Sequence, residues 1–304
     1  MGRTYKVPKI YTQIYADYLA ALQRAPLAAH TRRAYASRIR GFLNWLADGE
    51  ADTLGADPLA NAHGRDFAAR DYRAYLKTVR KLSPATVNAH LAALDHFYGS
   101  YLHLGPVKVG RDNPPALAPR GLTPREQKRY LRAVERLQLP RDRAIGRLLF
   151  YTGLRVGETV GLDVDDVALS ARKGQVIVRQ GKGGKSRTVP LLNATARDAL
   201  ATWLRDRATW PGANTPPLFL NRRGGRLSDR AVHDLISRIA TDADLVDDDG
   251  RPVSPHVLRH TFATNLLRES GVDIVTVAQL LGHSRVDTTR RYTLPTEEAL
   301  ERAV

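Results

Sequence analysis

The sequence contains no cysteine. This absence excludes disulfide frameworks, zinc sites built on thiolates and cysteine nucleophiles. The chain also has no N-terminal apolar run that resembles a signal peptide or a membrane span. We therefore expect a soluble, cytoplasmic protein without a membrane partner.

Acidic residues are too few to balance the basic ones. The chain has 47 Lys and Arg against 31 Asp and Glu, which gives a formal net charge of +16 at pH 7. This excess predicts a polyanionic partner, and nucleic acid is the commonest one. Basic membrane-surface proteins and ribosomal proteins share this balance, so charge alone says nothing about catalysis.

Clusters of carboxylates are also scarce. Asp163, Asp165 and Asp166 are close in sequence but lack evident partners. Metal-dependent nucleases hold divalent ions with several Asp and Glu oxygens. We therefore expect neither a metal nor another cofactor.

The length of 304 residues suits about two domains at the usual ~100–200 residues each. Apolar residues recur at helical spacing, with Lys and Arg on other faces, over residues 10–24, 31–47, 65–80 and 83–104. Residues 107–123 hold three prolines and no apolar periodicity, which is typical of a linker. We expect a helical domain at 1–108, a linker at 109–122 and a second domain at 123–304, with a tail from about 296.

The second domain is predicted to be mainly helical with a small β-sheet. Strand composition on both sides of a glycine-rich turn predicts a hairpin of residues 175–180 and 187–191. Lys182 and Lys185 would project from its tip, in reach of a DNA groove or simply in solvent. Caps and periodicity predict helices over 123–137, from about 141, and over 194–207, 228–240, 254–267, 273–281 and 296–304.

Residues 254–295 carry a dense set of polar side chains between helix stops. His256 and Arg259 would share one helix face, and Gly282 would end the next helix and leave His283 on a turn. A short helix after Ser284 should carry Tyr292, and Pro295 should stop it soon after. We expect Tyr292 to lie near a helix end, where local movement costs little free energy.

Arg155 is predicted to start a helix, with Glu158 on the same face. An arginine oriented by a carboxylate is suited to binding a phosphate with two hydrogen bonds. A surface Arg–Glu ion pair explains the pattern about as well.

Five motifs occur in order in the second domain: TGLRVGE from Thr152, GKGGKSRTVPL from Gly181, HVLRH from His256, LGHS from Leu281, and Tyr292. Together they resemble the tyrosine site-specific recombinases of the phage integrase family. The resemblance implies an α+β protein, with an N-terminal helical core-binding (SAM-like) domain and a catalytic domain of the DNA breaking-rejoining fold. The site residues it implies are Arg155, Lys182, His256, Arg259, His283 and Tyr292, with Lys185 as a competitor of Lys182.

The resemblance also implies a reaction and its partners. Tyr292 would attack a DNA phosphate and form a covalent 3′-phosphotyrosine, clamped by Arg155 and Arg259. The substrate would be double-stranded DNA with specific recombination sites, bound by a homo-tetramer (a dimer of dimers) or with a paralogous recombinase, and no small molecule would be needed. The short segment before Ile10 favours a two-domain recombinase of the Xer or mobile-element type.

Other interpretations compete with this one. A type IB topoisomerase-like enzyme would use the same tyrosyl chemistry to relax DNA, and a non-catalytic relative would only bind it. Tyr292 could instead be a hydrogen-bonded core tyrosine, His260 a core histidine, and His256 and Arg259 polar residues of an exposed face.

Overall fold

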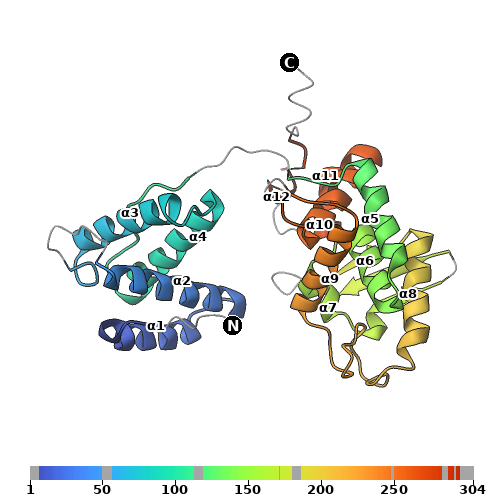
Figure 1. Cartoon of the computed structure of the whole chain (residues 1–304), viewed down its shortest axis with the longest axis horizontal. Coiled ribbons are helices and arrows are strands. Elements are labelled where there is room, and N and C mark those ends of the chain that lie inside the picture. The colour runs from blue at the N-terminus through green and yellow to red at the C-terminus, as the bar shows by residue number, and fades with distance from the viewer. Residues whose placement is uncertain are drawn as a thin grey trace, which may run out of the picture. The chain divides into compact units, whose positions relative to one another are not determined.

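The computed structural model describes residues 7–49, 57–112, 119–170, 172–179, 186–247, 250–282, 287–290 and 292–294. The chain forms two compact units, Met1–Pro115 and Ala116–Val304. Figure 1 shows that the first unit is built from helices and that the second combines helices with a small sheet. The predicted fold class, mainly α with a small β-sheet, is therefore confirmed.

The first unit packs its helices around aromatic side chains. Tyr18, Phe42 and Phe97 are fully buried there, and Trp45 and Tyr72 almost so. Asn61 caps one helix by accepting hydrogen bonds from the N–H groups of His63 and Gly64. The helices of this unit are α1 (Thr12–Arg24), α2 (Ala29–Ala47), α3 (Ala62–Thr78) and α4 (Pro84–Asp95), with a 3-10 turn at Lys9–Tyr11 and a π-helical turn at His96–Tyr101.

The second unit begins at α5 (Pro124–Arg136), where Thr123 and Glu126 form the predicted capping box. Its core contains Trp203, which is fully buried and donates from Nε1 to the carbonyl of Leu218 at 2.9 Å. The other helices are α6 (Pro140–Thr152), α7 (Val156–Gly161), α8 (Ala194–Arg207), α9 (Asp229–Asp242), α10 (Pro255–Thr264), α11 (Ile274–Leu281) and α12 (Asp287–Arg290).

The sheet of the second unit has three antiparallel strands in the order β1 (Val167–Leu169), β2 (Gly174–Val178) and β3 (Arg187–Pro190). The last two strands form the predicted hairpin, in which Val178 pairs with Arg187. The first strand was not predicted, because three residues are too few to show an alternating pattern. Val176 and Val189 are buried and attach the sheet to the core.

The C-terminal segments differ in part from the prediction. The helix expected to reach Leu267 is α-helical only to Thr264 and continues as a π-helical turn over Asn265–Glu269. Gly282 ends α11 with φ +64°, as expected. Tyr292 was expected within a helix, but it lies in the turn after α12, where its N–H donates to the carbonyl of Thr289 at 3.0 Å.

Among the helices that the structure describes, none has the length and apolar character needed to cross a membrane. The expected helix at 296–304 lies outside the described residues.

Replacement of Gly153 by alanine should destabilise the second unit. Gly153 ends α6 with φ +59°, and a Cβ there would lie 2.5 Å from Cδ1 of Phe262. The left-handed backbone and the overlap together predict a loss of about 2–4 kcal/mol. Urea unfolding of the full chain measures this loss. Gly161→Ala is the control, because nothing lies within 4 Å of a Cβ built there; equal stability of the two variants would refute the argument.

Candidate active site

Arg155 precedes the first turn of α7, and Glu158 holds it there. The carboxylate of Glu158 accepts the backbone N–H of Arg155 at 2.9 Å and its Nη1 at 2.7 Å. The Glu158 side chain is only 6% exposed, whereas that of Arg155 is 28% exposed. The carboxylate is therefore enclosed, while part of the guanidinium remains accessible to a ligand.

A third residue joins this pair from the sheet. Arg187, at the start of β3, donates from Nη1 and Nη2 to the two oxygens of Glu158 at 2.9 and 2.8 Å. Burial would raise the pKa of Glu158, but the hydrogen bonds from Arg187 and from the backbone of Arg155 outweigh it and lower that pKa to about 2. Glu158 is therefore ionised at neutral pH and compensates two neighbouring guanidiniums.

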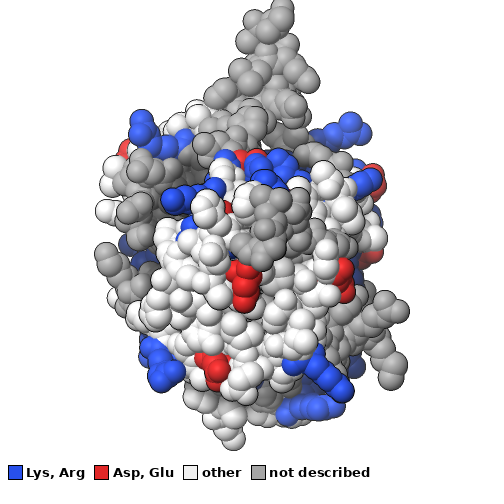
Figure 2. Space-filling model, turned by 90° about the vertical axis from the view of Figure 1, so that its left-hand side faces the viewer, with Lys and Arg blue, Asp and Glu red and all other residues white. Residues whose placement is uncertain are grey.

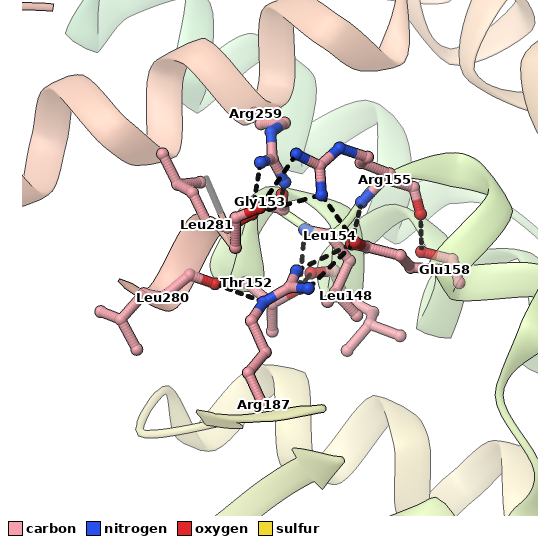
Figure 3. Close-up of polar contacts among 12 residues, drawn as sticks. Leu148, Thr152, Gly153, Leu154, Arg155, Glu158, Arg187, Arg259, Leu280 and Leu281 are labelled. Atoms are coloured by element: carbon pink, nitrogen blue, oxygen red, sulfur yellow. Dashed lines mark hydrogen bonds and ion pairs between the residues drawn. The ribbon is translucent and has the colours of Figure 1, made fainter. Parts of the chain in front are cut away.

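Arg259 reaches the same place from α10. Its guanidinium donates to the carbonyls of Gly153 and Leu281, each at 2.5 Å, and the side chain is buried. Arg155 also donates to the carbonyl of Leu281, at 3.4 Å, so the two predicted arginines meet at the C-terminal end of α11 (Figure 3). Carbonyls at a helix C-terminus lack partners within the helix and carry partial negative charge, which suits two cations.

Burial, and then the charge of Arg155, lower the pKa of Arg259 to about 10. The group is still charged at pH 7. Since a guanidinium has five N–H donors, the two bonds to carbonyls leave others that can bind an anion. Arg155 and Arg259 can therefore present two adjacent positive charges to a phosphate.

Tyr292 lies beside this cluster in a buried position. Tyr292 is 3% exposed and belongs to a small apolar cluster with Ala263, Val277 and Leu281. Leu281 also supplies the carbonyl shared by the two arginines, and the phenol interacts electrostatically with Arg259. The expectation of an easily moved tyrosine stays a prediction; in this conformation packing encloses the ring.

The hydroxyl of Tyr292 has a histidine partner. Its Oη lies 2.9 Å from Nδ1 of His260, and the two rings are 5.4 Å apart between centroids. This distance suits a hydrogen bond between the phenol and the imidazole. His260, set aside above as a core histidine, therefore contacts the predicted nucleophile. Its spacing of four residues from His256, which places both on one helix face, was the available signal.

Of the remaining predicted site residues, the structure describes His256. His256 is exposed. Desolvation by neighbouring protein atoms, and then the charge of Arg259, lower the pKa of its imidazole below the ordinary value of 6.5. The ring is therefore neutral at pH 7. Lys182, its competitor Lys185, and His283 lie outside the described residues. Arg187 was missed as a site residue, because a strand-start arginine shows its target only when the strand is placed against α7.

Two of the three neighbouring aspartates near the sheet form ion pairs. Asp163 pairs with Arg226 at 2.6 Å, and Asp166 pairs with Arg179. Within the described parts of the chain, no group of three or more His, Asp and Glu side chains is placed to hold a metal ion.

Figure 2 shows one face of the molecule, on which Lys and Arg form separate groups around a largely uncharged area.

Replacement of Glu158 by glutamine should destabilise the second unit by about 3–5 kcal/mol at pH 7, because two guanidiniums lose their buried counter-charge. The lowered pKa of Glu158 also predicts a pH dependence: its stabilisation, about 3 kcal/mol, is complete above pH 4.5 and is lost as the pH falls through about 2. Urea unfolding at several pH values should therefore show a weaker acid dependence in Glu158→Gln than in the parent.

Glu135→Gln is the matched control. Glu135 also pairs with an arginine, Arg147, but its side chain is 53% exposed. Such a pair contributes at most about 1 kcal/mol. Equal losses in the two variants would mean that Glu158 has no special role.

Two sequence models of known families match most of the chain. The sequence model of the phage integrase family matches residues 120–298, and that of the phage integrase N-terminal SAM-like domain matches residues 14–104. The tyrosine recombinase XerA of Thermococcus kodakarensis is 34% identical over 305 residues, which cover 97% of this chain and 94% of that protein.

A second relative matches more strongly over a shorter region. The tyrosine recombinase XerD of Mycobacterium leprae is 46% identical over 165 residues, 53% of this chain, so the match spans half the length of that protein. Among solved structures, the XerH site-specific recombinase bound to its difH substrate is similar in fold, with a TM-score of 0.69 and 23% identity over 90% of this chain and 78% of that one. Sequence and fold together show that this chain belongs to the phage integrase family, as a tyrosine recombinase of the Xer type.

Proposed function

We propose that this chain is a site-specific DNA recombinase, which cuts and rejoins DNA strands through a covalent 3′-phosphotyrosine at Tyr292. The observation that carries the proposal is the meeting of Arg155 and Arg259 at the carbonyl of Leu281, whose side chain belongs to the same apolar cluster as Tyr292. Two arginines and a tyrosine from separate segments are thereby brought into one region of the second unit.

The arginines would stabilise the transition state. Attack on a phosphodiester builds negative charge on the non-bridging oxygens while the attacking and leaving oxygens lie on opposite sides of phosphorus. Planar guanidiniums that stay charged can bind those oxygens through pairs of hydrogen bonds. Because Glu158 and the carbonyls at the end of α11 already fix Arg155 and Arg259, little reorganisation is needed when the phosphate arrives.

The tyrosine proton needs an acceptor. His260 is within hydrogen-bonding distance of Tyr292 Oη and is therefore the better placed of the two described histidines in this conformation. His256, neutral at pH 7 because its pKa is lowered, is a second acceptor once the phenol leaves its apolar cluster to reach a phosphate. His283 would donate to a phosphate oxygen.

The leaving 5′-oxygen needs a proton donor, and Lys182 takes that role in the proposal, because a hairpin tip can deliver an ammonium group into a DNA groove. The phosphotyrosine keeps the energy of the broken phosphodiester bond. A 5′-hydroxyl from another strand can therefore reverse the step and join the new strands without ATP.

Double-stranded DNA is the proposed partner. The net charge of +16 favours a polyanion, and XerH, which shares the fold, was crystallised on its difH DNA. We propose that the helical unit at residues 1–108 contacts the DNA and that residues 123–304 carry out catalysis. The recombinase names of the relatives disfavour the topoisomerase-like alternative, and a synapsis assay with two target sites would separate the two activities.

Tyr292→Phe should bind DNA as tightly as the parent but form no covalent adduct, because only the hydroxyl oxygen is lost. The target is first obtained by selecting bound duplexes from a random-sequence pool. Nicked duplexes with that target then trap the intermediate, which a denaturing gel detects as protein-linked DNA. An adduct that persists in Tyr292→Phe would exclude Tyr292 as the nucleophile.

Removal of residues 297–304 should weaken the assembly of four protomers on two DNA sites. The reason is that the family resemblance implies docking of the tail on a neighbouring protomer. Sedimentation of the parent and the truncated chain on the selected DNA measures the assembly, and binding to a single half-site serves as the control. Unchanged assembly after truncation would rule out this role of the tail.

A further inference from the structure

Arg187 occupies a junction in the second unit. It pairs with Val178 at the last rung of the β2–β3 hairpin, so its backbone lies where the chain returns from the segment that contains Lys182. Its side chain is only 11% exposed. The residue therefore points into the protein instead of towards solvent.

The guanidinium of Arg187 connects two other elements. Nη1 and Nη2 bind the two oxygens of Glu158 on α7, and Nε donates to the carbonyl of Leu280 on α11 at 2.8 Å. Gly282 packs directly against it, since a Cβ there would lie 2.7 Å from Nη1 of Arg187. One side chain of the sheet thus joins α7 to the end of α11, immediately before His283 (Figure 3).

The contact with Glu158 also affects Arg155. Oxygen Oε1 of Glu158 accepts from both Arg155 and Arg187, and Oε2 accepts from Arg187 and the backbone N–H of Arg155. Arg187 therefore takes up a large share of the carboxylate charge. This leaves more of the positive charge of Arg155, the more exposed of the two arginines, for an incoming phosphate.

We propose that Arg187 is a positioning residue of the DNA cleavage reaction. It aligns the lysine hairpin, Arg155 and the end of α11 through one planar guanidinium, and it does not touch the DNA itself. This role rests on the proposed function of the site. Lysine cannot replace it, because an ammonium group cannot bind both oxygens of Glu158 and the carbonyl of Leu280 with a fixed planar fork.

The test is Arg187→Lys, compared with Arg179→Lys. Arg179 is on the same hairpin but its ion pair is with Asp166, and its side chain is 59% exposed. Single-turnover formation of the covalent adduct on the nicked target DNA is measured for both variants, together with DNA affinity and thermal stability. Arg187→Lys should slow adduct formation about ten- to hundredfold, since a misplacement of about 1 Å can cost a hundredfold. Its DNA affinity should stay within about twofold, and Arg179→Lys should react like the parent.

A double-mutant cycle separates positioning from a general structural effect. If Arg187 acts through Glu158, the rate losses of Arg187→Lys and Glu158→Gln should not add in the double variant. Additive losses, a rate for Arg187→Lys within twofold of the parent, or a rate loss explained by the unfolded fraction would each overturn the proposal. A parent that forms no adduct would instead overturn the proposed function, and with it this role.

Discussion

One buried carboxylate makes the arginine cluster possible. Arg155, Arg187 and Arg259 come from α7, β3 and α10, and their positive charges repel one another at short range. Glu158 and the carbonyls at the end of α11 oppose that repulsion. The energy for this arrangement comes from the packing of α10 and α11 and from the caps of α7, so folding assembles a site that a short peptide could not hold.

The same arrangement explains why the cluster suits an anion such as a phosphate and not a metal cation. Two guanidiniums lie side by side, and their nearest carboxylate, Glu158, is already bound by Arg155 and Arg187. An incoming anion therefore meets a net positive surface whose donors are in place. A cation would meet the same charge and be repelled.

The proposed nucleophile, Tyr292, would have to leave its present position to react. Tyr292 is enclosed by apolar side chains, and its hydroxyl is hydrogen-bonded to His260. A phenol in that position is shielded from solvent and from an approaching phosphate. The proposed reaction would therefore require a rearrangement of the turn after α12, which is held by local backbone hydrogen bonds and by a hydrogen bond from Arg268 Nη2 to the carbonyl of Leu294 at 2.8 Å.

The sequence by itself determined the fold class, the helix limits near strong caps and the family, because caps, glycine stops and ordered motifs are local signals. Thr123 begins a helix and Gly282 ends one as predicted, because a capping side chain and a left-handed glycine each act within a few residues of the chain. Tertiary structure alone decided the partners: Arg187 with Glu158, and Tyr292 with His260, which are 29 and 32 residues apart. Such pairs depend on how helices and strands pack in space. The spacing of residues along one helix or strand does not reveal that packing.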